Sequence, residues 1–370
     1  MRKHLFSSLW ARKRRLLGGA IAVVIGVAFL AATLVLGDAM KSGIHSLLAE
    51  SNSGTDALVR SELEIGTADM STRSTVDERL VPELAGSPAV ASALPVVEGI
   101  AQLSGADGQL IGGDGPPTFG ENWLDFERNP YELVDGRAPE RAGEIVIDSD
   151  SADDGDLHVG DTTTVRVPDP IEATVVGIAE LRSGESLGGV TYTWFGTDTA
   201  QRLLLHSDDL VSAVNLTAAP GVSPEQLVAA VQPTLPSGVE AVTGTTLTAE
   251  DDADIAADFL DFFETFLLMF AGVALLVSTF TIHNTFSIVV AQRTRESALL
   301  RALGASRRQV LGAVLAEAVV VGVIASALGI LGGLGLAVGL DALMDAVGFD
   351  LPGTSLVVNT DTVAMAMAVG

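Results

Sequence analysis

The chain contains no cysteine and only three lysines among its 370 residues. Without cysteine, disulfides, thiol catalysis and cysteine-ligated zinc are excluded. None of the lysines, at positions 3, 13 and 41, directly follows a glycine, although the phosphate-binding loop of a nucleotide hydrolase requires that order. The five histidines are scattered, without the spacing of metal ligands. We therefore expect no ATPase motif, catalytic residue, cofactor or metal site in this chain.

Basic residues are outnumbered by acidic ones, 21 to 47, which gives a net charge of −26. Forty of the acids but only ten of the basic residues lie between Asp38 and Asp261. Strong acidity keeps an exposed domain soluble and disfavours nucleic acid as a partner. The middle of the chain is therefore predicted to be a soluble domain that binds no nucleic acid.

Three apolar runs are long enough to cross a bilayer, which takes about 20 residues of helix. They are Leu16–Leu36, Phe259–Val290 and Val310–Leu340. The first begins like a signal peptide, but its apolar core exceeds the usual ~7–15 residues and GDAMKS offers no convincing cleavage site. We interpret it as an uncleaved transmembrane helix.

Positive charge gathers beside these runs. Residues 1–15 carry six basic residues and no acid, and residues 292–309 carry five arginines against Glu296 alone. Lysine and arginine near the ends of membrane spans accumulate on the cytoplasmic side. Both segments are therefore predicted to be cytoplasmic, which places the acidic middle of the chain on the other side of the membrane.

The predicted fold class is an α-helical membrane protein with an α+β extracytoplasmic domain inserted between the first and second transmembrane helices. The expected segments are a basic cytoplasmic N-terminus (1–15), transmembrane helix 1 (16–37), the extracytoplasmic core domain (38–258), transmembrane helix 2 with a stalk (259–290), a cytoplasmic loop (291–309), transmembrane helix 3 (310–340), an exterior connection (341–360) and the start of transmembrane helix 4 (361–370). Acids on one side and Ile255, Phe259, Phe263 and Phe266 on the other predict that the stalk begins near residue 249 as an amphipathic helix, with a solvated acidic linker as the alternative.

Alternation of apolar and polar residues predicts the strands of the exterior domain, and a 3.6-residue period predicts its helices. The expected strands are Leu58–Ile65, Ala93–Leu103, Glu144–Asp148, Thr162–Val167, Ile171–Ala179, Ala213–Thr217 and Val239–Thr243. The expected helices are Val76–Leu84 and Pro224–Val231, the second opened by Ser223 as its N-cap.

Two patterns in this domain resemble functional motifs but fail their requirements. Residues 184–188 read GESLG, yet a nucleophile elbow must lead directly into a helix, and β-prone residues follow here. Residues 148–156 are rich in Asp, yet Ala152 and Val159 stand where an EF-hand loop needs a ligand and its final Glu. We interpret the first as a glycine-rich turn and the second as a solvated acidic turn.

A longer pattern spans the loop between the second and third apolar runs. It consists of FTIHNTF (280–286), QRTRE (292–296) and LRALGAS (300–306), followed by Gln309 and Glu317. This stretch resembles the FtsX/MacB-type permeases of ABC transporters, and the N-terminal span and the place of the exterior domain agree with that family. The resemblance implies a multi-pass protein of a bacterial plasma membrane that pairs with a separate cytoplasmic ATPase, which binds ATP and magnesium. It further implies a homodimer or a pseudo-dimer with a second permease half, contact with membrane lipids, and a longer permease of which this chain is the first part.

The loop itself predicts a short docking helix. Glu296 to Leu303 makes two turns before Gly304, a typical C-terminal stop. Exposed leucines and arginines suit a groove on a partner protein, although a helix lying on lipid head groups explains them equally well. The resemblance favours docking. The predicted ATPase-coupling residues are Arg293, Arg295, Glu296, Leu299, Leu300, Arg301 and Gly304.

Polar and small residues within the apolar runs form a second set. Asn284 and Glu317 are predicted intramembrane polar residues, and an ionised carboxylate at that depth needs a partner. Gly329, Gly333, Gly335 and Gly339 form a small-residue seam for helix packing.

The resemblance implies mechanotransmission, in which ATP-driven motion of the partner reshapes an exterior domain that handles lipids, lipoproteins or peptides. The alternative is an FtsX-like regulator that activates a cell-wall hydrolase without transport. A membrane-anchored sensor without an ATPase is a third possibility.

Overall fold

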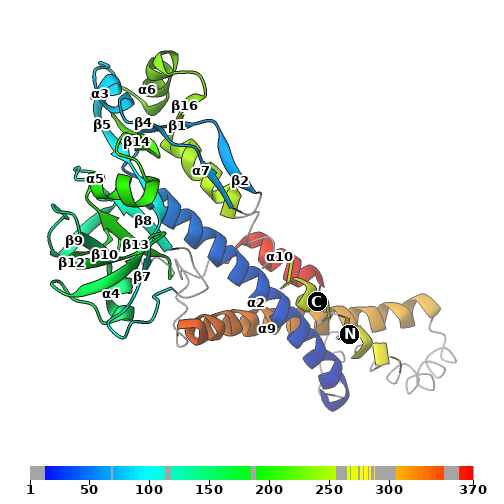
Figure 1. The fold of residues 1–370 in the computed structure, drawn as a ribbon. Helices are drawn as coiled ribbons and strands as arrows, with labels where there is room; N and C mark the ends of the chain where they lie inside the picture. The colour runs from blue at the N-terminus through cyan, green and yellow to red at the C-terminus, as the bar shows by residue number, and fades with distance from the viewer. Residues whose placement is uncertain are drawn as a thin grey trace. The chain divides into compact units, whose positions relative to one another are not determined.

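The structure is a computed structural model, and its chain divides into two compact units (Figure 1). It describes residues 13–67, 70–112, 118–184, 189–255, 265–266, 268–273, 276–277, 279–281, 283–284, 287, 306–345 and 358–369. The helical unit comprises Met1–Ser42, Phe259–Gly348 and Thr354–Gly370. The α+β unit comprises Gly43–Asp258 and Phe349–Gly353.

Two long apolar helices dominate the helical unit. Helix α2 runs over Lys13–Ser51 and continues into the α+β unit, and α9 runs over Arg307–Asp345. Within them, Ala20–Ser51 and Ala318–Leu340 are long and apolar enough to cross a membrane. The short apolar helix α10 covers Thr360–Val369.

Small side chains bring these three helices together. Val27 and Ala31 of α2 form a buried cluster with Ala366 of α10, and Ile330 of α9 packs against it. The hydroxyl of Thr362 on α10 donates a hydrogen bond of 2.8 Å to Asp38 on α2. This bond gives a carboxylate within an apolar helix one of the partners that it needs.

The α+β unit has two lobes. The first lobe is built on a four-stranded antiparallel sheet in the order β16-β1-β15-β5. Its strands are β1 (Ala57–Ser61), β5 (Val90–Val96), β15 (Ala213–Ala218) and β16 (Val239–Thr243). Helices α3 (Leu80–Ala85) and α6 (Pro224–Val231) belong to this lobe, with a β2–β3 hairpin (Glu64–Thr67, Met70–Arg73) and the strand pair β4 (Val76–Asp77) and β14 (Leu210–Val211).

The second lobe lies between β5 and β14 in the sequence and forms an eight-stranded mixed sheet. Its strands follow the order β6-β8-β13-β10-β12-β11-β7, and β9 also pairs with β12. They cover Glu98–Ile100 (β6), Gln102–Leu103 (β7), Thr118–Asn122 (β8), Tyr131–Gly136 (β9), Glu144–Asp148 (β10), Thr162–Arg166 (β11), Pro170–Leu181 (β12) and Thr191–Phe195 (β13). Helices α4 (Ser149–Gly155) and α5 (Thr197–Ala200) and the π-helix η1 (Gln201–Leu205) complete the lobe.

One apolar core runs through both lobes. It includes Val59 and Leu216 of the first sheet and Ile145, Ile147 and Phe195 of the second, all fully buried. Removing this apolar surface from water stabilises the unit by roughly 25 cal/mol per Å². A smaller cluster, centred on Tyr131 and Trp194, covers the opposite face of the second sheet.

Several predicted elements are confirmed. Strands β10, β11, β12, β15 and β16 match the predicted strands 144–148, 162–167, 171–179, 213–217 and 239–243 to within two residues. Helix α6 begins as predicted, with a capping box in which the Ser223 hydroxyl accepts from the Gln226 N–H and the Gln226 side chain accepts from the Ser223 N–H.

Other predicted elements are wrong in extent. The expected strand 58–65 is broken after Ser61, whose hydroxyl accepts from the Leu63 N–H and turns the chain into the β2–β3 hairpin. The expected strand 93–103 breaks at Val97, where the chain passes from the first sheet to the second. The expected helix 76–84 begins only at Leu80, because Val76–Asp77 pairs with β14 instead.

The acidic stretch 148–156 is also not a solvated turn. It forms helix α4, because the buried Asp148 side chain accepts from the Ser151 N–H and caps the first turn. Strands β8, β9 and β13 have no counterpart among the predicted strands. Helix α9 extends beyond the expected span 310–340 at both ends, and helix α2 extends past the expected end at residue 37.

Candidate functional site at the base of the α+β unit

The chain enters and leaves the α+β unit through two helices that lie against each other. These are the last turns of α2 and helix α7, Gly244–Ile255. The Nδ1 atom of His45 lies 2.5 Å from Oδ2 of Asp252, and the Asn52 amide donates to Asp251 at 3.0 Å. Helix α2 and the turn that follows it therefore both contact α7.

The start of α7 fits closely against the turn that follows α2. A Cβ atom at Gly244 would lie 2.2 Å from the backbone oxygen of Thr55, so only glycine permits this approach. The Thr248 hydroxyl, one turn along, donates to the Gly244 carbonyl and accepts from the Asn52 amide. Gly244 and Thr248 therefore hold the start of α7 against the turn that follows α2.

A buried arginine joins α7 to the first sheet. Arg60 of β1 is 5% exposed, and its guanidinium contacts Glu240 of β16 at 3.1 Å and Glu250 of α7. Arg73 of β3 contacts Glu240 at 3.2 Å and Glu64 at 3.0 Å. A buried charge is costly unless it is paired, so separating Glu250 from Arg60 would cost free energy. Arg60 therefore holds α7 to the sheet.

The end of α2 also contacts the second lobe. The Glu50 carboxylate accepts from the Ser183 N–H at 2.9 Å, and Leu47 packs against the cluster around Trp194. The following turn places Asp56 2.7 Å from Arg128 of the second lobe and 2.7 Å from the Ala218 N–H of the first. A displacement of α2 would therefore act on both lobes.

Asp148 is the most buried carboxylate among the described residues of the second lobe, at 1% exposure. It accepts hydrogen bonds from the Ser151 N–H and hydroxyl and from the Tyr192 N–H, at 2.6–2.8 Å. Burial raises its pKa to about 6, although these hydrogen bonds oppose the change. These contacts join α4, β10 and β13, so the residue has a structural role.

The predicted coupling residues, Arg293, Arg295, Glu296, Leu299, Leu300, Arg301 and Gly304, lie outside the described residues, and their role stays a prediction. The predicted polar residues fall on helices. Asn284 belongs to a helical segment and is exposed, and Glu317 lies in α9.

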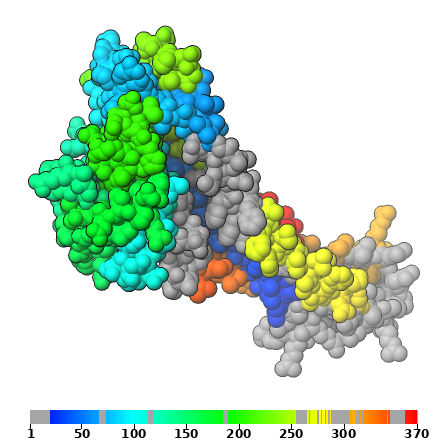
Figure 2. Space-filling view, viewed as in Figure 1, coloured from blue at the N-terminus to red at the C-terminus, as the bar shows by residue number. Residues whose placement is uncertain are grey.

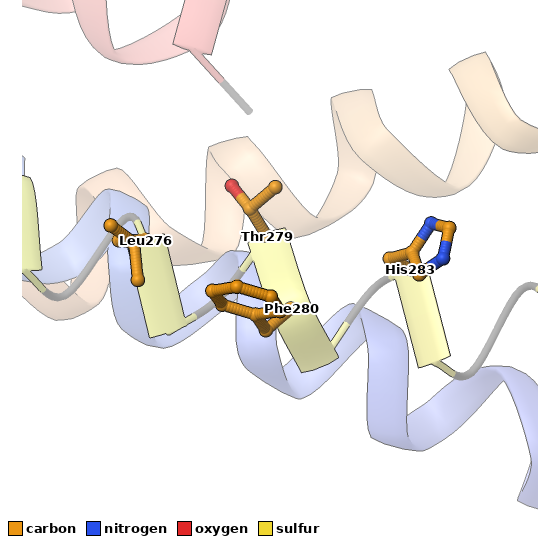
Figure 3. A pocket seen from close by; sticks show the side chains of 4 residues that line it. All are labelled: Leu276, Thr279, Phe280 and His283. Carbon is orange, nitrogen blue, oxygen red and sulfur yellow. The ribbon is translucent and has the colours of Figure 1, made fainter.

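The second apolar run carries a shallow pocket of about 420 Å³. Its lining residues Leu276, Thr279, Phe280 and His283 have i, i+3, i+4, i+7 spacing and therefore share one helix face. Figure 3 shows all four side chains projecting from the same helical segment. The histidine precedes Asn284, so the polar end of this face coincides with the motif that carries the family resemblance.

The predicted glycine seam divides into two pairs. A Cβ atom at Gly329 would lie 2.7 Å from Cβ of Val27, and one at Gly333 would lie 2.6 Å from the backbone oxygen of Ala28. A Cβ atom at Gly335 or Gly339 would meet no described atom within 4 Å. The first two glycines lie where α9 meets α2 and the last two do not.

Sequence reasoning misses the ion pairs at the base, because Arg60, Glu240 and Glu250 are far apart along the chain and carry no motif. The only sequence signal for these ion pairs is the acidic run at 250–254. By itself, this run predicts only the polar face of an amphipathic helix. Within the part of the chain that the structure describes, no three His, Asp or Glu side chains are grouped to hold a metal ion.

Comparisons with known proteins define the class. Residues 20–234 match the model of the MacB-like periplasmic core domain, and residues 268–369 match that of the FtsX-like permease C-terminal region. A protein with this pair of domains is a membrane permease. The chain belongs to the FtsX/MacB-type family of ABC transporter permeases.

Two curated relatives agree with this assignment. An uncharacterized ABC transporter permease protein of Mycobacterium tuberculosis is 28% identical over 348 residues, covering 92% of this chain and 38% of the relative. An uncharacterized ABC transporter permease of Bacillus subtilis is 38% identical over 90 residues, covering 24% of this chain and 22% of the relative. The matched region thus covers well under half the length of either relative.

Two solved structures are similar to the middle of the chain, both at 12% identity. The periplasmic region of MacB from Actinobacillus actinomycetemcomitans aligns over 56% of this chain and 98% of its own, with a TM-score of 0.38. The extracellular domain of the noncanonical ABC-type transporter YknZ from Gram-positive bacteria aligns over 51% of this chain and 100% of its own, with a TM-score of 0.37.

Proposed function

We propose that this chain is a permease subunit that works by mechanotransmission, coupling a separate cytoplasmic ATPase to its exterior α+β unit. The observation that carries the proposal is the paired base of that unit. Helices α2 and α7, through which the chain enters and leaves, are joined by His45–Asp252, and the turn after α2 is joined to α7 by Asn52–Asp251. Movement of one helix along its axis is therefore transmitted to the other.

The length of α2 supports this mechanism. Its 39 residues make a helix of about 58 Å, whereas the hydrocarbon core of a bilayer is about 30 Å thick. A membrane-spanning α2 therefore has a surplus of several turns, and its last turns are those that contact α7 and both lobes. One continuous helix is stiff enough to carry a displacement from membrane depth to the exterior domain.

The motor is a partner in this proposal. The chain has no phosphate-binding loop, so a separate ABC ATPase binds ATP and magnesium. It docks on the cytoplasmic loop 291–309 through Leu299, Leu300 and the arginines. The chain lies in a bacterial plasma membrane with its N-terminus in the cytoplasm, and it acts with a second copy or a second permease half. The exterior unit handles amphiphiles such as lipids, lipoproteins or peptides.

Coprecipitation of the ATPase tests the docking step. The Leu300→Asp, Arg301→Glu double variant removes apolar contact and reverses a charge, changes that at an interface centre cost about 2–5 kcal/mol. We expect ATPase recovery with this variant to fall at least tenfold, while membrane insertion is kept. Arg141→Glu, an exposed arginine of the α+β unit, is the charge-reversal control. Undiminished ATPase recovery with the double variant would contradict docking at this loop.

A further inference from the structure

One face of the second sheet is defined by two glycines on neighbouring strands. Gly99 of β6 lies opposite Gly120 of β8. A Cβ atom at Gly120 would lie 2.6 Å from Cβ of Ala101, and one at Gly99 would lie 3.0 Å from Cβ of Leu204 in η1. The glycines face η1, whose region forms a front surface of the α+β unit, green in Figure 2. Because side chains alternate along a strand, the neighbours of both glycines project from the opposite face.

These neighbours form two rows across three strands. The first row is apolar, with Ile100 opposite Phe119 and Phe119 opposite Tyr192. Ile100 is 65% exposed and Phe119 is 37% exposed, and the Phe119 ring lies 5.4 Å from that of Tyr192. Ile100 and Phe119 therefore present adjacent apolar side chains to solvent on this face of the sheet.

The second row is acidic. Glu98 lies directly opposite Glu121, and Trp194 follows on the next strand and donates from Nε1 to Glu121 at 3.1 Å. Like charges directly opposite each other destabilise a sheet. Among the residues that the structure describes, no lysine, arginine or histidine forms an ion pair with either glutamate.

The electrostatics of this pair favour a positive ligand. Desolvation by the surrounding protein raises the pKa of Glu98, and the negative charge of Asp251 on α7 raises it further. Part of the Glu98 side chain nevertheless reaches solvent. Burial also raises the pKa of Glu121, with a further contribution from Glu98, and the Trp194 hydrogen bond opposes the change. A cation placed between the two carboxylates would relieve their repulsion.

We propose that Ile100, Phe119, Glu98 and Glu121 form a binding surface for a cationic amphiphilic peptide. The apolar row takes an apolar side chain of the peptide, and the acidic row takes a lysine or arginine next to it. Aromatic rings behind the carboxylates, Tyr192 and Trp194, add a platform that attracts cations. Asp251 supplies a further negative charge from α7, so a bound peptide would lie beside the base contacts. The inference rests on the proposed function, because it names the substrate class that the exterior unit handles.

Peptide binding to the full chain with its ATPase tests the proposal, in nanodiscs of neutral phosphatidylcholine. The probe is a fluorescent synthetic peptide of alternating leucine and lysine, and the matched probe carries glutamine in place of lysine. The Glu98→Gln, Glu121→Gln double variant should weaken binding of the lysine peptide about tenfold or more and leave the glutamine peptide unchanged. Phe119→Ala should weaken both peptides about fivefold.

The controls separate this surface from general acidity. Glu172→Gln removes an exposed charge on the β11–β12 hairpin, and Val134→Ala removes exposed apolar area on β9. Neither should change binding. Undiminished binding to the double glutamate variant, equal binding of both peptides to the unmodified chain, or an equal loss with Glu172→Gln would each overturn the proposal. ATPase recovery should stay unchanged in every variant, so failure here is distinguishable from failure of the docking step.

Discussion

The imidazole of His45 lies 2.5 Å from the carboxylate of Asp252, although the two residues are 207 positions apart. This contact joins the helix that carries the chain into the α+β unit to the helix that carries it out. The nearby Arg60 network ties the second of these helices to the first sheet. The base therefore joins both helices to the folded domain.

Replacement of the buried arginine should loosen helix α7. We expect Arg60→Met to lower the free energy of unfolding by about 1–3 kcal/mol, because Glu240 and Glu250 lose their buried guanidinium partner and keep only Arg73, and to speed amide hydrogen exchange in α7. Hydrogen exchange followed by mass spectrometry measures both effects. Arg79→Met is the control, since the Arg79–Asp77 pair is largely exposed and exposed pairs contribute little. Equal protection of α7 in the two variants would show that Arg60 does not hold it.

Asp148 should give the unfolding free energy a distinct pH dependence. Burial raises its pKa from 3.8 to about 6 in the folded protein, so the folded state holds this proton more tightly than the unfolded state does. The resulting stabilisation is complete below about pH 4 and is lost as the pH rises to about 6, an effect on the order of 3 kcal/mol.

Asp148→Asn removes this titration. The stability of the unmodified protein relative to the variant should therefore fall between pH 4 and pH 7, as measured by tryptophan fluorescence during chemical unfolding. Asp153→Asn, on the exposed side of α4, controls for loss of a charge. A stability difference between the protein and Asp148→Asn that is constant over this range would refute the assignment.

The glycines of α9 should differ in their tolerance of larger side chains. Gly329→Leu and Gly333→Leu would force a side chain into Val27 and the Ala28 backbone, and overpacking costs about 1–3 kcal/mol. Gly335→Leu gains the same helix propensity as the other two substitutions, and its Cβ atom would meet no described atom within 4 Å. We expect the unfolding midpoint in detergent to fall for the first two variants and to hold or rise for the third. Three equal midpoints would argue against close packing at this seam.

Thiol labelling tests the proposed orientation, and the cysteine-free chain needs no background removal. In intact cells, an impermeant reagent should label Ser183→Cys but leave Ser7→Cys and Ser306→Cys unlabelled, because lysine and arginine hold their segments in the cytoplasm. All three should react once the membrane is permeabilised. Labelling of Ser306→Cys from outside would reverse the topology.

Local sequence patterns were enough to predict the class of this protein. The evidence was local: three apolar runs, the distribution of charge and the motif across residues 280–317. These features can be recognised without knowing any tertiary contact. Strands β10, β12 and β16 were also predictable, because buried strands bounded by turn residues leave a strong local pattern. The absence of a phosphate-binding lysine belongs to the same kind of information.

Contacts between residues that are distant in the sequence could be read only from the folded structure. Pairing of Glu98 with Glu121, the contacts of Arg60, and the change of sheet at Val97 depend on strand order and register. The acidic stretch after Asp148 became a helix because the buried carboxylate of that residue found the Ser151 N–H. Local propensity carries no information about partners far along the chain. Burial and register supply it, and they placed the base contacts and the acidic row where the sequence showed no motif.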